Sequence, residues 1–346
     1  MNAKQARREK RNLSLLPKPV PPRNPGDELE MNGTAFKSGG VVNGMEMMTR
    51  DWNKETKSDP SSITSAELDP SIIEAGLSSI RENAESIKNS KTISDIKFKN
   101  ADKFFLIGAG GSLSDIPKHM LLEMSNFGTT ITTNRGIKFF EKYEDCLDFA
   151  FFVDSKSYIF ADEKWFHDFD KSQTQAIASV NTHPSALKGW AENYFFGFSF
   201  GRVNEWEKEL HKLNIDRNRL TNLDSGLCSL SSQLHMISQI NPKAEIYLLG
   251  HDFSYYKGLK YFDVEFKATE IEEKRIMSHP DFAFDIMPDK EGRFTITQEY
   301  LKRQAQIIAA QVKVLAEGGA KVYNLASGGI LYFPEIIQST LEEVLP

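Results

Sequence analysis

Cysteine is scarce in this sequence, because 346 residues hold only Cys146 and Cys228. The two lie far apart, and neither belongs to a C-x-x-C pair. This excludes a disulfide scaffold and offers neither a zinc ribbon nor a thioredoxin-like redox site. Two isolated cysteines are typical of a reducing compartment, so we expect a cytoplasmic protein.

Long hydrophobic runs and an excess of positive charge are also missing. The longest apolar runs, such as Phe104–Ala109 and Phe149–Val153, are far shorter than the roughly 20 residues that a membrane helix needs. We therefore expect no membrane span. With 42 Lys and Arg against 48 Asp and Glu, the net charge of −6 argues against a protein that coats nucleic acid. The basic amino terminus lacks an apolar h-region, so no secretory signal is expected.

Residues 1–65 are basic, rich in proline and without a sustained apolar period. Such a segment cannot bury enough surface to offset its ordering entropy, which predicts an extended or disordered flexible arm. Its basic run from Lys4 to Arg11 is either a solvated terminus or a short helix that contacts nucleic acid, a membrane surface or a partner. Asp69 and Pro70 then open an amphipathic lead-in helix within 66–95.

From about residue 96 to 346, short apolar runs alternate with helical patterns. Alternation of strand and helix implies crossover connections and a mostly parallel sheet. The sequence therefore predicts an α/β, Rossmann-like domain with helices on both faces. The predicted strands are 103–108, 129–133, 149–154, 176–180, 194–198, 245–250 and 321–324, and the predicted helices are 114–125, 136–141, 226–240, 298–317 and 335–343.

The stretch from about 255 to 293 interrupts this alternation with mixed charges and aromatic residues. Nearly forty residues without a clear element are long for a connection. We interpret the stretch as a lid over a site, with a small helical insertion as the alternative.

Ligands of open parallel sheets bind outside the carboxyl ends of the strands, where the strand order reverses. The first such end carries Gly108, Gly110, Gly111 and Ser112 before a predicted helix. Backbone N–H groups there could hold a phosphate, or the glycines could simply fit a tight strand-to-helix corner. The loop is neither GxxxxGK[ST] nor GxGxxG, which argues against a P-loop NTPase and a dinucleotide dehydrogenase.

Two further strand ends carry polar residues, and each of these has two alternative interpretations. Asn134 could read a base or ribose, or serve as a turn residue. Asp154 could hold a cation or ribose, or cap a helix. Ser225 and Gly226 form a second helix start suited to phosphate.

His251 and Asp252 follow the apolar strand 245–250 and could supply acid–base or metal chemistry. Adjacent residues of an extended segment point in opposite directions, so one of the pair faces the ligand. We expect Asp252 to face it and His251 to be packed or exposed.

Together these strand ends resemble the 6-hydroxymethylpterin diphosphokinase MptE-like family, which includes the Maf flagellin glycosyltransferases. A more distant likeness is to bacterial CMP-sialic acid transferases. The family loop G-x-G-P-S-L is matched by Gly108–Leu113, with Gly111 in place of the proline. The remaining matches are Asn134, Asp154, Ser225–Gly226, the G-x-D of Gly250 and Asp252, and the closing turn Asn324–Gly329.

The resemblance implies a nucleotide-dependent glycosyltransferase that uses a CMP-activated acidic sugar and a protein or glycan acceptor. It assigns the phosphate to Gly110, Gly111 and Ser112. The ribose or base falls to Asn134 and Asp154, and the other side of the nucleotide to Ser225 and Gly226. The sialyltransferase histidine base has no counterpart in residues 293–297, and His279 is the candidate from the same connecting region.

Two other functions remain open. A 6-hydroxymethylpterin diphosphokinase would need ATP and Mg²⁺, with Asp154 and Asp252 as the available metal ligands. A protein without activity could instead use this nucleotide-binding fold for assembly or binding through its basic arm.

Overall fold

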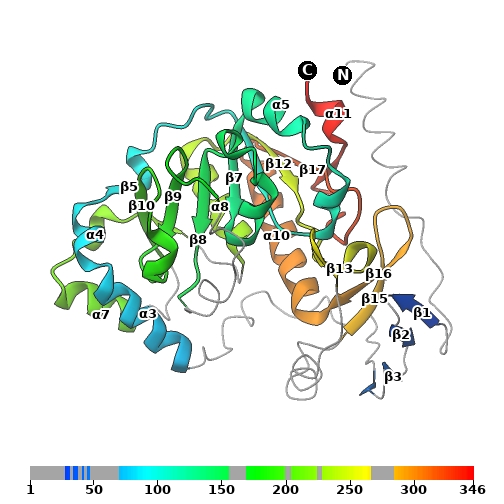
Figure 1. Ribbon diagram of the computed structural model, residues 1–346, viewed down its shortest axis with the longest axis horizontal. Helices are drawn as coiled ribbons and strands as arrows, with labels where there is room; N and C mark the ends of the chain where they lie inside the picture. The colour runs from blue at the N-terminus through cyan, green and yellow to red at the C-terminus, as the bar shows by residue number, and fades with distance from the viewer. Residues whose placement is uncertain are drawn as a thin grey trace.

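The computed structural model describes residues 28–31, 34–37, 41–42, 45–46, 70–155, 169–198, 204–223, 228–265 and 284–346. Its centre is a ten-stranded sheet in the order β11-β10-β9-β8-β7-β6-β12-β17-β18, with β5 also paired to β10 (Figure 1). Every pairing in this sheet is parallel, which confirms the predicted α/β class. Its strands are β5 Lys91–Thr92, β6 Lys103–Ile107, β7 Thr129–Thr133, β8 Phe149–Phe152, β9 Gln175–Ser179, β10 Asn193–Phe198, β11 Asn222–Leu223, β12 Glu245–Leu249, β17 Lys321–Asn324 and β18 Ile337–Gln338.

The central strands are buried on both faces, as covered parallel strands are. β6 and β8 achieve this with nearly continuous apolar residues. β7 is unusual because four of its five residues are threonine and all are buried. Three threonine hydroxyls donate to backbone carbonyls: Thr129 to Asn100 at 2.8 Å, Thr130 to Cys146 at 2.7 Å and Thr132 to Ile107 at 3.0 Å. These bonds remove the cost of burying the hydroxyls and let a β-branched polar strand lie in the core.

The lead-in helix forms two α-helices, α3 (Pro70–Glu82) and α4 (Ala84–Asn89). Asn83 separates them, and its side-chain amide donates to the carbonyl of Thr182 at 2.8 Å. α3 packs against α7 (Asn204–Lys212), where Trp206 donates to the carbonyl of Ile73 at 3.3 Å. The lead-in segment is thereby fixed to the β10 side of the sheet (Figure 1).

Among the predicted helices, α8 (Ser229–Ile240) and α10 (Glu299–Glu317) are confirmed within the described residues. The predicted helix 114–125 is instead split into a 3₁₀ segment, η3 (Gly111–Asp115), and α5 (Met120–Phe127). Pro117 lies between them, lacks an N–H group and disfavours helical backbone in the preceding residue. The predicted helix 136–141 is a 3₁₀ segment, η4 (Asn134–Phe140).

The predicted helix 335–343 is wrong. That segment holds β18 and the short α11 (Leu341–Val344). Thr340 and Glu343 form a capping box, which starts the helix at Leu341 and leaves the residues before it free to pair with β17.

The described parts of 255–293 contain hairpin strands rather than helices. A short 3₁₀ turn, η9 (Tyr256–Gly258), leads to the antiparallel pair β13 (Leu259–Tyr261) and β14 (Val264–Glu265). A second antiparallel pair joins β15 (Phe284–Pro288) to β16 (Phe294–Gln298). The predicted role as a lid stays a prediction.

The described residues of the amino-terminal arm form two antiparallel pairs. β1 (Glu28–Met31) pairs with β2 (Thr34–Lys37), and β3 (Val41–Val42) pairs with β4 (Met45–Glu46). None of these four strands joins the ten-stranded sheet. The other residues predicted as the arm lie outside the described part of the chain.

The strand order reverses between β6 and β12. The chain runs from β6 outward through β11 and then returns to β12 on the other side of β6. Right-handed crossovers in opposite directions place α5 on one face and α8 and α10 on the other. α8 and α10 pack together, and α10 also packs on β16 and β17. The β6–β12 junction is therefore the switch point where a ligand site is expected.

Candidate functional site

Four adjacent strands place most of the predicted residues at one edge of the sheet. In sheet order, β8 leads to Asp154, β7 to Asn134, β6 to the loop Gly108–Ser112 and β12 to Gly250–Asp252. Parallel strands have their carboxyl ends at the same edge of the sheet, so the residues that follow these four strands lie side by side. The predicted residues Ser225, Gly226 and His279 lie outside the described residues, and their roles stay predictions.

The glycine-rich loop after β6 packs directly against the end of β12. Gly108 N–H donates to the carbonyl of Leu249 and Gly110 N–H to that of Gly250, both at 2.8 Å. A Cβ at Gly108 would lie 2.3 Å from the carbonyl oxygen of Gly250, and one at Gly110 would lie 2.5 Å from Asp252 Oδ2. Glycine is therefore required here so that the two loops can approach each other, whatever ligand the loop binds.

Asp252 joins the loop after β12 to the glycine-rich loop after β6 by hydrogen bonds. Its side chain accepts a hydrogen bond from Ser112 N–H at Oδ2, at 2.8 Å, and a short one from Ser112 Oγ at Oδ1. Asp252 is only 2 % exposed, and this burial raises the pKa of its carboxyl to about 6, against the opposing effect of the Ser112 bonds. The Ser112 donors that the sequence assigned to a phosphate are thus engaged by Asp252.

His251 is packed, as expected. Its imidazole is buried, and burial lowers its pKa to about 4, so the ring is neutral at pH 7. Nε2 has no hydrogen-bond partner in the part of the chain that the structure describes.

Asn134 and Asp154 bind each other. The Asn134 amide donates to Asp154 Oδ2 at 2.9 Å, while its own oxygen accepts from the N–H of Arg135 at 3.0 Å. Burial raises the pKa of Asp154, and the bond from Asn134 opposes that effect. The Arg135 guanidinium lies 4.1 Å from the ring centroid of Tyr261, which places a cation beside this pair.

The two predicted metal ligands do not meet. Asp154 follows β8 and Asp252 follows β12, with β7 and β6 between them. Three strand spacings amount to about 14 Å, which is too far for one Mg²⁺ ion to bind both carboxylates. Within the described ranges, no group of three or more His, Cys, Asp or Glu side chains could hold a metal ion. The metal assignment stays a prediction for each carboxylate separately.

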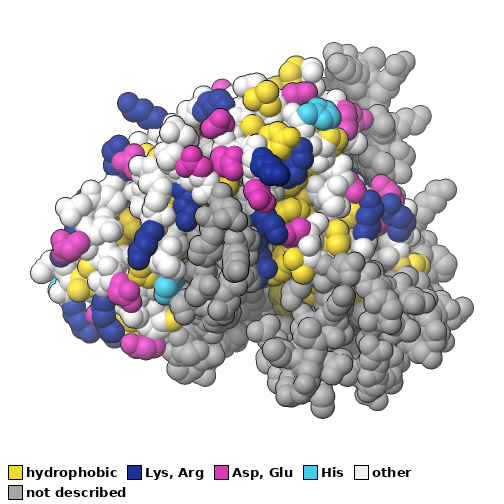
Figure 2. Space-filling model, in the orientation of Figure 1, with side chains coloured by type: hydrophobic (Ala, Val, Ile, Leu, Met, Phe, Trp, Pro, Cys, Tyr) yellow, Lys and Arg dark blue, Asp and Glu magenta, His cyan; other side chains and the backbone are white. Residues whose placement is uncertain are grey.

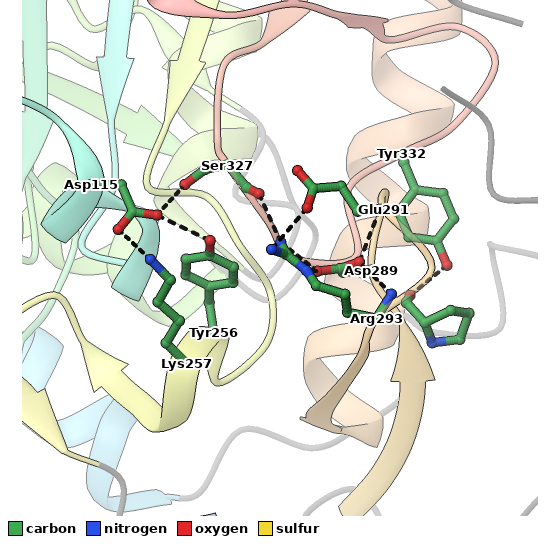
Figure 3. A network of polar contacts seen from close by, with 9 residues as sticks. Asp115, Tyr256, Lys257, Asp289, Glu291, Arg293, Ser327 and Tyr332 are labelled. Atoms are coloured by element: carbon green, nitrogen blue, oxygen red, sulfur yellow. Dashed lines mark hydrogen bonds and ion pairs between the residues drawn. The ribbon is translucent and has the colours of Figure 1, made fainter. Parts of the chain in front are cut away.

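A second polar centre joins three loops at Asp115, the last residue of η3 (Figure 3). Lys257 donates to Oδ1 at 2.6 Å, and Tyr256 and Ser327 donate to Oδ2 at 3.0 and 2.7 Å. Burial alone would raise the pKa of Asp115, but the bonds from Lys257, Ser327 and Tyr256 together lower it. Asp115 thereby connects the loops that follow β6, β12 and β17.

The β15–β16 turn joins the same network through Arg293 (Figure 3). Its guanidinium binds Asp289 at 2.9 Å, Glu291 at 2.8 Å and the carbonyl of Ser327 at 3.2 Å. The predicted closing turn therefore contributes Ser327, while Asn324 has a structural role because its amide donates to the carbonyl of Leu331 at 2.9 Å.

Sequence reasoning missed Asp115, Lys257 and Arg293. Asp115 follows the glycine-rich loop by a few residues, and the others lie in the aperiodic stretch 255–293. The available signal was local: the sequence Asp289-Lys290-Glu291-Gly292-Arg293 is a charged turn between two apolar runs.

The described surface carries no large patch of one sign on the face shown in Figure 2. Lys and Arg side chains are interspersed there with Asp and Glu. None of the described helices combines the length and apolar character needed to cross a membrane.

No protein-family model and no curated protein matches the chain. Among solved structures, it is similar to the Maf glycosyltransferase from Magnetospirillum magneticum AMB-1, with a TM-score of 0.52 and 12 % sequence identity. The match covers 78 % of this chain and 39 % of that structure, so the chain spans about two fifths of its length. At this identity the likeness establishes a shared fold.

Proposed function

We propose that this chain is a nucleotide-dependent glycosyltransferase that transfers an acidic sugar from a CMP-activated donor to a hydroxyl group of a protein or glycan. The observation that carries the proposal is the junction of the β6 and β12 loops at the switch point, flanked by Asn134 and Asp154 on the neighbouring strand ends. The fold shared with a Maf glycosyltransferase points to the same reaction class by analogy.

In this proposal, Asn134 and Asp154 bind the nucleoside. Their mutual bond uses one carboxylate oxygen of Asp154, so the other oxygen is assigned to a ribose hydroxyl. Arg135, beside Tyr261, adds positive charge on the same side. The glycine-rich loop then lies next to the nucleoside, on the adjacent strand, where the donor phosphate would follow.

The reaction is a displacement at the anomeric carbon. The acceptor oxygen bonds to this carbon, the bond to the phosphate oxygen breaks, and CMP leaves with the electron pair while the hydroxyl proton passes to a base. Both oxygens of Asp252 are engaged by Ser112, so we assign Asp252 to positioning the loop rather than to taking that proton. His279 remains the predicted base. Positive charge and N–H dipoles near the leaving phosphate would lower the barrier.

A thermal-shift series with CMP, CDP, UDP, GDP and ATP, each in EDTA and in Mg²⁺, tests this function. We expect cytidine nucleotides to raise the melting temperature in EDTA, because a ligand at 100 times its Kd stabilises the fold by about 2.7 kcal/mol. Stabilisation by ATP only with Mg²⁺ would favour the diphosphokinase. Stabilisation by none of the nucleotides would favour a binding or assembly protein.

Release of CMP from CMP-N-acetylneuraminate tests the chemistry directly. We expect the protein to release CMP in EDTA, and faster when a hydroxyl acceptor is present. Binding of CMP without any release from this donor would leave cytidine recognition intact and count against this acidic sugar as the transferred group.

A further inference from the structure

The β15–β16 turn has a shape dictated by its sequence. Asp289 N–H donates to the carbonyl of Arg293 at 2.7 Å, and Gly292 N–H donates to that of Asp289 at 2.9 Å. Gly292 has a φ of +79°, a conformation that L side chains rarely adopt. The Asp289 carboxylate also accepts from the N–H groups of Glu291 and Arg293, both at 2.9 Å. This leaves Lys290 in the first central position of a rigid turn.

Both acidic side chains of the turn bind the Arg293 guanidinium. Asp289 is 2 % exposed and binds the Arg293 side chain at 2.9 Å, and Glu291 binds it at 2.8 Å. Lys290 is partly buried, and among the described residues none forms a hydrogen bond or ion pair with it. A partly desolvated ammonium group without a bonded anion is costly, and burial lowers the pKa of Lys290 accordingly.

The turn is held beside the switch point. Tyr255 N–H donates to the carbonyl of Ile296, and Thr297 Oγ1 donates to that of Phe253, both at 2.7 Å. These bonds fix β16 to the segment that follows Asp252.

From the other side, Tyr332 donates to the carbonyl of Pro288 at 2.7 Å, and Arg293 donates to that of Ser327. The closing turn that Arg293 contacts packs on Asp252, because Ile330 N–H donates to the carbonyl of Asp252 at 2.8 Å. The charges of Lys290 and Asp252 each oppose the effect of burial on the pKa of the other group. The turn that carries Lys290 is therefore held beside the junction of the β6 and β12 loops.

We propose that Lys290 is the cation that binds an oxyanion of the ligand at the β6–β12 junction. The Ser112 donors are engaged by Asp252, so the loop needs a positive charge from elsewhere to hold such a group. The oxyanion is the phosphate of the nucleotide or the carboxylate of the acidic sugar. Only this choice of ligand rests on the proposed function.

Lysine labelling of the parent protein tests this assignment without a known activity. An amine-reactive ester is applied with and without inorganic pyrophosphate, CMP, cytidine or N-acetylneuraminate, and modification is measured at each lysine by mass spectrometry. Lys313, exposed on α10, is the internal control. We expect pyrophosphate and CMP to slow the labelling of Lys290 but not of Lys313, and cytidine to have no effect. Protection by N-acetylneuraminate alone would assign the lysine to the sugar carboxylate.

Matched variants make the test quantitative. Replacing Lys290 with methionine keeps most of the side-chain volume and removes the charge, and we expect CMP binding about tenfold to a hundredfold weaker, since a charge-assisted hydrogen bond is lost. Lys290→Arg should retain part of the affinity, and Lys313→Met all of it. Binding of CMP by a folded Lys290→Met protein with the affinity of the parent would overturn the role in phosphate binding.

The two proposals fail separately. If pyrophosphate protects Lys290 but CMP neither binds nor protects, the oxyanion site stands and the cytidine donor is wrong. If CMP stabilises the parent while no anion protects Lys290, the nucleotide proposal stands and the assignment of Lys290 is wrong. Absence of protection by every anion overturns the inference irrespective of the nucleotide result.

Discussion

On the β7–β8 side of the switch point, polar side chains stand directly at strand ends, whereas on the β12–β17 side they are held by contacts between distant segments. Asn134 and Asp154 hydrogen-bond to each other and are only 20 residues apart in sequence. Ser112 and Asp252 are 140 residues apart, and Asp115 and Ser327 are 212 apart. The polar pair on the β7–β8 side forms because two neighbouring strands end there. The contacts on the β12–β17 side form only when the loops after β6, β12 and β17 pack together.

The largest expected effect on stability is on the β12–β17 side. Asp252→Ala removes the acceptor of two buried bonds and leaves the N–H and hydroxyl of Ser112 without partners. We expect a loss of about 3 kcal/mol in the free energy of unfolding, measured by urea denaturation. A loss below about 1 kcal/mol would contradict the view that Asp252 joins the two loops.

The pH dependence of stability sharpens the comparison, because His251 and Asp252 act in opposite directions. Burial raises the pKa of Asp252 to about 6, so the extra stability that comes from protonating its carboxyl is lost as pH rises from about 4 to 6. Burial lowers the pKa of His251 to about 4, so its contribution is gained as pH rises from about 4 to 6.5. Each effect is about 3 kcal/mol, and the two nearly cancel in the parent.

Single variants should reveal each effect. Asp252→Asn leaves the His251 contribution, so its stability should rise from pH 4 to 6.5 relative to the parent. His251→Gln should show the reverse trend. Urea denaturation at a series of pH values measures both slopes, and parallel pH profiles for the parent and both variants would contradict these assignments.

A smaller effect is expected at the three-loop centre. Asp115→Asn removes the ion pair with Lys257 and weakens the bonds from Tyr256 and Ser327. Because the group is partly exposed, we expect a loss of only about 1 kcal/mol. High salt should narrow the difference between the variant and the parent, since salt screens the ion pair. A difference that is unchanged by salt would show that shape, not charge, matters at Asp115.

The smallest effect on stability is expected on the β7–β8 side. Asp154→Asn keeps the shape and an acceptor for Asn134 while it removes a buried charge. We expect a stability change below about 1 kcal/mol and continued binding of a cytidine nucleotide in EDTA, measured by thermal shift. Loss of nucleotide binding in EDTA by the parent itself would favour the metal-dependent kinase instead.

Sequence patterns predicted the sheet because burial on both faces leaves a local trace. The run that forms β8 is apolar throughout, those that form β6 and β12 are apolar after a charged first residue, and all five residues of β7 are β-branched. The same patterns located the strand ends, and hence Asn134, Asp154, the glycine-rich loop and Asp252. The β13–β14 hairpin was missed because strands of three and two residues carry little periodicity. The β15–β16 hairpin was missed although β16 alternates Phe294 and Ile296 with Thr295 and Thr297, which is the period of a strand.

What the sequence alone determined is therefore the class of sheet and the chemistry offered at its edge. It did not determine which groups are already engaged. That Asp252 takes the donors of Ser112, and that Arg293 takes both acids of its turn while Lys290 remains unpaired among the described residues, follows from contacts between distant segments. Propensity and hydrophobic period act over a few residues, whereas hydrogen bonds and charges pair by proximity in space. Only the tertiary structure decides that proximity.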